Sequence, residues 1–172
     1  THPNYEVPTD SDNDNKYQVE VKAVEGVNNY SATQTVTITV ANLNEASPVI
    51  DTTNLTGSIA ENSDKNDIIY DVSASDADTA DVLTYSVSGA DASLLTIDSS
   101  NGQVKLKSSA DFETKNSYSF NVVATDNGTG TLQDSKAVTL NISDVNEAPV
   151  ITSGATSTIA EITATSTVVY TG

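Results

Sequence analysis

The stretch YSFNVVATD, residues 118–126, has an apolar residue at every second position and ends on an acid. Successive side chains of an extended strand point to opposite faces, so Tyr118, Phe120, Val122 and Ala124 would share one face. A helix would instead need apolar residues three to four positions apart. The stretch therefore predicts a strand with one buried face.

Two further runs alternate in the same way, and turn-forming residues at 99–102 and 126–130 separate the runs. No segment keeps helical spacing of apolar residues over ten or more positions. About seven short strands per hundred residues are typical of an antiparallel Greek-key β-sandwich, so we expect an all-β fold. The alternating apolar positions of the two runs are Leu83, Tyr85 and Val87, and Val138, Leu140 and Ile142.

The sequence repeats itself with a period of about 100 residues. Two full periods need more than the 172 residues present, and the chain has no Met, so we expect a segment of a longer protein. We expect the end of one repeat at 1–47, a complete repeat at 48–148 and the start of a third at 149–172. The phrases that realign are YQVEVKAVEG (17–26) with YSFNVVATDNG (118–128), TVTITVANLNEA (35–46) with AVTLNISDVNEA (137–148), and SIAEN (58–62) with TIAEI (158–162).

Charge and composition narrow the range of partners. The chain has 24 acidic residues against 7 basic ones, all Lys, and a net charge of -17. Such a chain repels nucleic acid and anionic lipid, and the lack of Arg removes bidentate phosphate recognition. The lack of Cys excludes thiolate metal ligands. No apolar run approaches the roughly 20 residues of a membrane span, and no leader opens the chain, so we expect neither.

The acids of the complete repeat gather in short phrases at predicted strand ends. In a sandwich these ends meet at two poles, and carboxylates crowded at a pole repel one another beyond what seven Lys can offset. Ca²⁺ takes six to eight oxygen ligands, so we expect Ca²⁺ there. The N-terminal pole would hold Asp76, Asp78 and Asp126, and the C-terminal pole Glu61, Asp111, Glu113 and the DVNE phrase with Asp144, Asn146 and Glu147.

The phrases AEN, DAD, DFE, ATD and DVNEAP together resemble those of the cadherin repeat, in its bacterial cadherin-like form. That family has an AEN or PEN phrase, a DxD phrase, a phrase of Asp, an aromatic residue or Arg, and Glu, an ATD phrase and a linker of the DxNDN-P type. The resemblance covers essentially the whole chain. It implies that Ca²⁺ ions lie between consecutive domains and stiffen a tandem array into a rod.

The resemblance also implies which residues would hold the ions. Asn4, Glu25 and Asn42 stand where the family usually has Asp, so we expect fewer or weaker ions at the first junction, between residues 1–47 and the complete repeat. The ligands of that junction would be Glu6, Asn44, Glu45, Asp76, Asp78 and Asp126, with carbonyls of Leu43 and Ala46. Those of the second junction, at the C-terminal pole, would be Glu61, Asp111, Glu113, Asn146 and Glu147, with carbonyls of Val145 and Ala148.

The resemblance implies a non-enzymatic, extracellular function. We expect a calcium-binding module of a bacterial protein that rigidifies a tandem-repeat rod for cell adhesion or surface assembly. Its partners would be neighbouring repeats, other copies of the chain, or a cell-surface or polysaccharide ligand. The alternative is a carbohydrate-binding module of a secreted polysaccharide-degrading enzyme. The chain has no Trp, whereas sugar platforms usually present exposed aromatic rings, and this favours the rod.

Four other interpretations carry less weight. Asp111 and Glu113 lie two positions apart and face no opposing wall, unlike the two carboxylates of a glycosidase. His2 has no nucleophile phrase to join in a catalytic triad. The acids of DSDNDN, at 10–15, are expected to form a solvated loop rather than a separate metal loop. The tail from Pro149 could add strands to the incomplete leading repeat of another copy, although the two pieces fall short of a full repeat.

Overall fold

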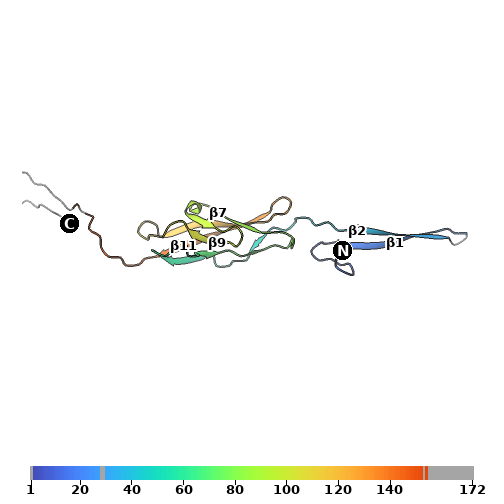
Figure 1. The fold of residues 1–172 in the computed structure, drawn as a ribbon, viewed down its shortest axis with the longest axis horizontal. Coiled ribbons are helices and arrows are strands. Elements are labelled where there is room, and N and C mark those ends of the chain that lie inside the picture. The colour runs from blue at the N-terminus through green and yellow to red at the C-terminus, as the bar shows by residue number, and fades with distance from the viewer. Residues whose placement is uncertain (1, 28–29, 153, 155–172) are drawn as a thin grey trace, which may run out of the picture.

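The structure of the chain is a computed structural model that describes residues 2–27, 30–152 and 154. The described chain is elongated (Figure 1). A two-stranded hairpin lies at one end, a β-sandwich follows, and the segment after the last strand leaves the sandwich at the opposite end.

The sandwich contains two main sheets. One has the strand order β4-β11-β10-β7 and the other the order β5-β9-β8, while β3 pairs with β6. The strands are β3 (Val49–Ile50), β4 (Thr56–Ala60), β5 (Tyr70–Asp71), β6 (Ala74–Ser75), β7 (Thr84–Ser88), β8 (Leu95–Ile97), β9 (Gln103–Leu106), β10 (Ser117–Thr125) and β11 (Gln133–Ser143). The prediction of an all-β sandwich is confirmed.

One strand pair differs from a wholly antiparallel sandwich. Strands β4 and β11 pair in parallel, because both run from the N-terminal pole to the C-terminal pole of the sandwich. Their last paired residues are Ala60 and Ser143. The residues that follow, Glu61 and Asp144, therefore emerge side by side at the C-terminal pole.

The core lies between the two sheets. Strand β10 contributes the alternating residues predicted from its sequence, and Phe120 and Val122 are 2% and 0% exposed. The ring of Tyr70, from the opposite sheet, meets Phe120 edge to face at a centroid distance of 6.3 Å. The buried apolar side chains are Ile50, Ile69, Tyr70, Val72, Leu95, Val104, Leu106, Ala110, Tyr118, Phe120, Val122, Ala124, Val138, Leu140 and Ile142.

Among the residues that the structure describes, no second sheet covers the N-terminal hairpin. It consists of β1 (Lys16–Val24) and β2 (Ser31–Thr39), paired antiparallel. Its apolar residues Val21 and Ile38 are 53% and 54% exposed. This arrangement is what the division into an incomplete repeat at 1–47 and a complete repeat at 48–148 would produce, and that division stays a prediction. Nearly all of the third repeat, and with it the strand-exchange hypothesis, lies outside the described residues.

Helix is scarce in the described part of the chain. A single 3₁₀ turn, η1 (Ala92–Leu94), precedes β8. None of the described residues form a helix with the length and apolar character that crossing a membrane requires.

Candidate metal sites

The first junction brings together carboxylates from three separate segments. Single oxygens of Glu6, Glu45 and Asp78 all lie within 4.8 Å of one another. Asp78 is 1% exposed, and its Oδ2 accepts a hydrogen bond from the backbone amide of Ala46 at 3.0 Å. That bond joins the linker to the sandwich. Glu6 Oε1 is shielded from solvent and has no hydrogen-bond partner.

Asn4 shapes the turn that presents Glu6. Its Oδ1 accepts hydrogen bonds from the backbone amides of Glu6 at 2.8 Å and Val7 at 3.1 Å. An Asp carboxylate accepts the same two bonds, so Asn at this position keeps the turn and removes one negative charge.

Beside these carboxylates, the loop between β10 and β11 is organised by Asp126, which is 3% exposed. Its Oδ1 accepts hydrogen bonds from the amides of Gly128 at 3.1 Å and Leu132 at 3.0 Å. It also accepts one from Asn44 Nδ2 at 3.1 Å, which joins the linker to this loop. Asp76 Oδ1 accepts the amide of Asp78 at 2.9 Å. All the predicted side-chain ligands of the first junction thus gather at the N-terminal pole, and their role as ligands stays a prediction.

One acid at this pole was missed by the sequence analysis. The backbone amide of Asp81 donates to the carbonyl of Asp78 at 2.9 Å, and this turn places Asp81 among the other acids. Burial raises the pKa of Asp81 above its ordinary value, and the charges of Asp126, Asp78 and Asp76 raise it further. The signal was available, because a third acid follows the DAD phrase three positions later.

No lysine neutralises these acids. Among the described residues the ion pairs are Lys16 with Asp14 at 3.2 Å and Lys115 with Asp91 at 3.0 Å, and neither pair includes a predicted ligand. Buried carboxylates without a cationic partner repel one another. Several oxygens of the site are also shielded from solvent and lack a donor, which fits a hard cation with oxygen ligands. These oxygens are Glu6 Oε1, Asn44 Oδ1, Asp76 Oδ2 and Asp81 Oδ2.

The second junction is organised by Glu61, which is 3% exposed. Its two carboxylate oxygens accept backbone amides of Phe112 and Val145, each at 2.8 Å. Oxygens of Glu61, Glu113 and Asp144 lie within 4.8 Å of one another. Asp144 belongs to the DVNE phrase but was not among the expected ligands.

The charge of this group acts on Glu113. A hydrogen bond to its own backbone amide lowers the pKa of Glu113, but partial desolvation and the charges of Glu61, Glu147 and Asp144 outweigh that effect. The net result is a pKa raised above the ordinary glutamate value. Repulsion between neighbouring carboxylates therefore raises the pKa of an acid at each pole, Asp81 at the N-terminal pole and Glu113 at the C-terminal pole.

The other predicted ligands of the second junction lie outside the three-carboxylate group. Asp111 is exposed, and its Oδ1 accepts the amide of Thr114 at 2.9 Å. Glu147 Oε1 accepts Asn62 Nδ2 at 2.7 Å. Asn146 is exposed. The DxD phrase that would complete this site is absent from the sequence, so these roles stay predictions.

The DSDNDN loop is partly as expected. Oxygens of Asp10, Asp12 and Asp14 lie within 4.8 Å of one another, and Lys16 pairs with Asp14. Asp12 and Asp14 are exposed, as in a solvated loop, whereas both carboxylate oxygens of Asp10 are shielded and have no hydrogen-bond partner.

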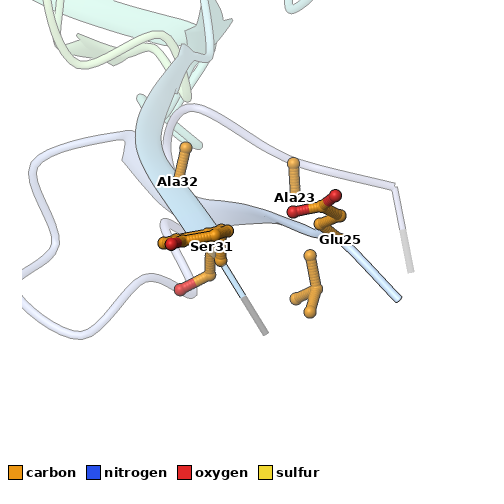
Figure 2. A pocket seen from close by; sticks show the side chains of 6 residues that line it. Ala23, Glu25, Ser31 and Ala32 are labelled. Carbon is orange, nitrogen blue, oxygen red and sulfur yellow. The ribbon is translucent and has the colours of Figure 1, made fainter. Parts of the chain in front are cut away.

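A shallow hollow at the far end of the hairpin has fewer possible metal ligands than the two junctions. Figure 2 shows Ala23, Glu25, Ser31 and Ala32 around it, and Val24 and Tyr30 complete the lining. Glu25 is the one carboxylate in that lining, so the hollow lacks the oxygen-rich set found at the two junctions.

Comparison with known proteins identifies the class. The cadherin domain family matches residues 55–143, which lie within the sandwich, and the chain belongs to this family. Cadherin domains are extracellular, non-catalytic adhesion modules, so the predictions of an extracellular location and of no enzymatic activity are confirmed.

The relatives are long animal proteins. The chain is 32% identical over 145 residues to human protocadherin-1, covering 81% of this chain and 14% of the relative. It is 32% identical over 150 residues to human protocadherin Fat 1, covering 84% and 3%. It is 32% identical over 126 residues to the Drosophila melanogaster protein dachsous, covering 71% and 4%. These matches support the cadherin repeat and give no support to its bacterial form.

Solved structures share the fold. Mouse clustered PcdhgC3 EC1-3 matches with a TM-score of 0.69 at 22% identity, over 80% of this chain and 46% of that one. Drosophila N-cadherin EC1-4 matches with a TM-score of 0.66 at 22% identity, over 82% and 34%. Both matches identify the all-β cadherin sandwich.

Proposed function

We propose that the chain is a calcium-binding segment of a tandem array of cadherin repeats, in which Ca²⁺ converts a loose junction into a rigid one. The observation that carries this proposal is the group of Glu6, Glu45 and Asp78. Its three carboxylates come from the incomplete repeat, the linker and the sandwich. A cation held by all three would tie these segments together.

The residues of the chain determine how such a junction would switch. Without a cation, repulsion between Glu6, Glu45 and Asp78 favours separation of the segments. Ca²⁺ supplies positive charge and accepts the shielded oxygens that lack donors. Because the cation binds the ordered junction better than the loose one, it shifts the population toward the ordered state. At a free concentration ~100 times the dissociation constant, the stabilisation is roughly 2.7 kcal/mol per site.

The second junction would act in the same way toward the next repeat. Glu61 holds both the DFE turn and the linker through the amides of Phe112 and Val145, so a cation bound there would find these segments already positioned. We propose Glu61, Asp111, Glu113, Asn146 and Glu147 as its ligands on this chain, and the following repeat would complete the set.

The wider function follows from the rod. We propose that the array serves cell adhesion or surface assembly. From the sequence phrases alone, we also propose that the repeat in this chain is the bacterial cadherin-like form. The neighbouring repeats are its first partners. A second copy is a further partner, because one solved relative is described as a protocadherin gammaB7 EC3-6 cis-dimer. The carbohydrate-binding alternative is not favoured, since the rings of Tyr70, Tyr118 and Phe120 lie in the core and a single described aromatic ring, that of Tyr30 at 72%, is largely exposed.

Calorimetric titration of Ca²⁺ into chelator-treated protein tests the proposal, with X-ray scattering on the same samples to follow the maximum dimension. We expect binding together with a longer, stiffer particle. Asp76→Ala with Asp78→Ala should abolish both at the first junction. Asp67→Ala with Asp71→Ala, two exposed acids outside the metal groups, should change neither. Absence of binding up to tens of millimolar Ca²⁺, roughly tenfold or more above the usual extracellular range, would reject the proposal.

A further inference from the structure

We infer that Asn127 is a site of spontaneous deamidation in the folded chain, at which its side-chain amide is converted to a carboxylate. The reaction needs water and no other reactant. It concerns a group that the proposed function does not use, and it requires no cation. The reacting atoms belong to the loop between β10 and β11.

The sequence Asn-Gly occurs at residues 101–102, before β9, and at residues 127–128, before β11. In such a pair the backbone nitrogen of the glycine can attack the side-chain amide carbon of the asparagine, because glycine has no Cβ to obstruct the approach. Both asparagines are exposed. The surroundings of the two glycine nitrogens therefore decide which pair reacts.

The nitrogen of Gly128 has a proton acceptor in place. Its N–H donates to Asp126 Oδ1 at 3.1 Å. The amide of Leu132 donates to both oxygens of the same carboxylate, at 3.0 and 3.1 Å, so the orientation of Asp126 does not depend on the bond from Gly128. A carboxylate held at the N–H gives the proton a place to go as the nitrogen attacks.

The amide carbon of Asn127 is activated from the other side. Asn127 Oδ1 accepts a hydrogen bond from the backbone amide of Val82 at 2.8 Å. Negative charge develops on this oxygen when the neighbouring carbon is attacked, and a fixed backbone donor stabilises that charge. The nucleophile, the proton acceptor and the donor to the developing charge thus meet in one loop.

The reaction balances with water as the co-reactant. A bond forms between Gly128 N and Asn127 Cγ, the bond from Cγ to Nδ2 breaks, and the proton lost by Gly128 leaves on Nδ2 as ammonia. Water then opens the succinimide ring that results. Its attack at Cγ gives aspartate, and its attack at the backbone carbonyl carbon of residue 127 gives isoaspartate.

The pair Asn101 and Gly102 lacks such an acceptor. The Gly102 amide donates to the backbone carbonyl of Asp98 at 2.9 Å, and a carbonyl does not take up the proton. Gly102 is buried, and a Cβ there would clash with the carbonyl oxygen of Val72, so the turn has no room to move. Asn101 Oδ1 also accepts an amide, that of Gln103 at 3.1 Å, so the two pairs differ chiefly at the glycine nitrogen.

Conversion of Asn127 would change the first junction. The new carboxylate lies one residue from Asp126, so repulsion at the N-terminal pole increases. Isoaspartate would also lengthen the backbone by a methylene group just before Gly128, where a Cβ would lie 2.5 Å from Asn44 Nδ2 and Asp81 Oδ2. Deamidation would therefore loosen the contact between the linker and the sandwich.

Peptide mapping by mass spectrometry tests the inference on the full chain, incubated in chelator at mildly alkaline pH either folded or unfolded in urea. In urea the two pairs should react at similar rates. In the folded chain residue 127 should convert at least about tenfold faster than residue 101, a modest part of the roughly 10²–10⁴-fold that a placed proton acceptor supplies in enzymes. Equal rates at the two pairs, or slower conversion of residue 127 when folded than in urea, would overturn the inference.

Asp126→Asn separates activation by the carboxylate from simple exposure of the loop. The variant keeps an oxygen for the amides of Gly128 and Leu132 but cannot take up a proton. Conversion of residue 127 should fall by about tenfold, whereas Asp67→Asn, at an exposed position outside the loop, should leave it unchanged. Circular dichroism establishes that each variant is folded, and the folded-against-urea comparison of the unchanged chain stands without them. Undiminished conversion in folded Asp126→Asn would show that the carboxylate is not the acceptor and would overturn the inference.

Discussion

The hairpins β1-β2 and β10-β11 have the same strand pairing and opposite burial. In the first hairpin Val19 lies opposite Val36, and in the second Phe120 lies opposite Val138, one sequence period later. Val19 and Val36 are 46% and 40% exposed, whereas Phe120 and Val138 are 2% and 1% exposed. The repeat therefore preserves the register of the pair but not its environment.

The difference in burial shows that the alternating sequence pattern specifies the pairing of a hairpin but not whether its face is covered. Alternation and turn residues specify a hairpin locally, since the register follows from the period-two pattern and the turn. Burial needs the second sheet, β5-β9-β8, whose strands come from residues 70–106. The complete repeat includes those residues and the described part of the first repeat does not.

The largest change in stability is expected when equivalent positions of the two hairpins are substituted. Phe120→Ala should lower the free energy of unfolding by about 3–5 kcal/mol, because it removes a fully buried ring that packs against Tyr70. Val19→Ala, one period earlier, should change it by less than about 0.5 kcal/mol, because the side chain is largely exposed. Chemical denaturation followed by circular dichroism measures both.

Similar losses for these two variants would show that the first hairpin is packed in solution against something outside this chain or against another copy. A concentration series on the Val19→Ala protein would then separate those two cases, since only association between copies depends on its concentration.

An intermediate effect, on the affinity for Ca²⁺, is expected when the glycines in the turns of the two hairpins are substituted. Gly128→Ala should weaken Ca²⁺ binding at the first junction by about tenfold, because its Cβ would lie 2.5 Å from Asn44 Nδ2 and Asp81 Oδ2. Gly26→Ala should leave binding unchanged, since no atom of the described residues lies within 4 Å of a Cβ there. Calorimetric titration of both variants is the measurement. Equal affinities would show that the side chains of Asn44 and Asp81 move aside without cost to the site.

Much of the sandwich was predictable from local patterns. The alternation in β10 and β11 identified their buried faces, because a half-buried strand must repeat every second residue. The parallel pairing of β4 with β11 was not predictable in this way. It joins Ala60 to Ser143, and no local signal specifies a partner so far along the chain.

The candidate sites show the same division. Asp78, Asp126 and Glu61 stand in recognisable phrases at strand ends, so their gathering at the poles followed from the phrases and the strand directions. Asp81 was missed because a backbone turn brings it to the pole. Asp111 lies outside the three-carboxylate group because its Oδ1 accepts the amide of its own turn at Thr114, and its role as a ligand of the second junction stays a prediction. Turn hydrogen bonds of this kind depend on side-chain geometry that spacing does not specify.

The smallest effect, on the pH dependence of stability, is expected at the two ion pairs, one beside the N-terminal hairpin and one in the sandwich. A hydrogen bond from the Ser119 amide, at 2.7 Å, and to a lesser extent Lys115, lower the pKa of Asp91 in the sandwich despite partial burial. The amide of Lys16 likewise lowers the pKa of Asp14 beside the hairpin, where the side chain is 42% exposed. Asp91 is 15% exposed at its side chain, so its interactions are less screened by water.

A carboxylate with a lowered folded pKa stabilises the protein above its unfolded pKa of about 3.9, and this contribution is lost as pH falls through the folded value. Asp91→Asn should therefore cost on the order of 1 kcal/mol at neutral pH and bring the variant closer to the unchanged chain below about pH 4. Asp14→Asn should show the same pH dependence much more weakly, because water screens the exposed Asp14 side chain. Denaturation in chelator from pH 7 to pH 2 tests both, and a loss for Asp91→Asn that persists undiminished in acid would show that the Ser119 bond does not depend on the charge of Asp91.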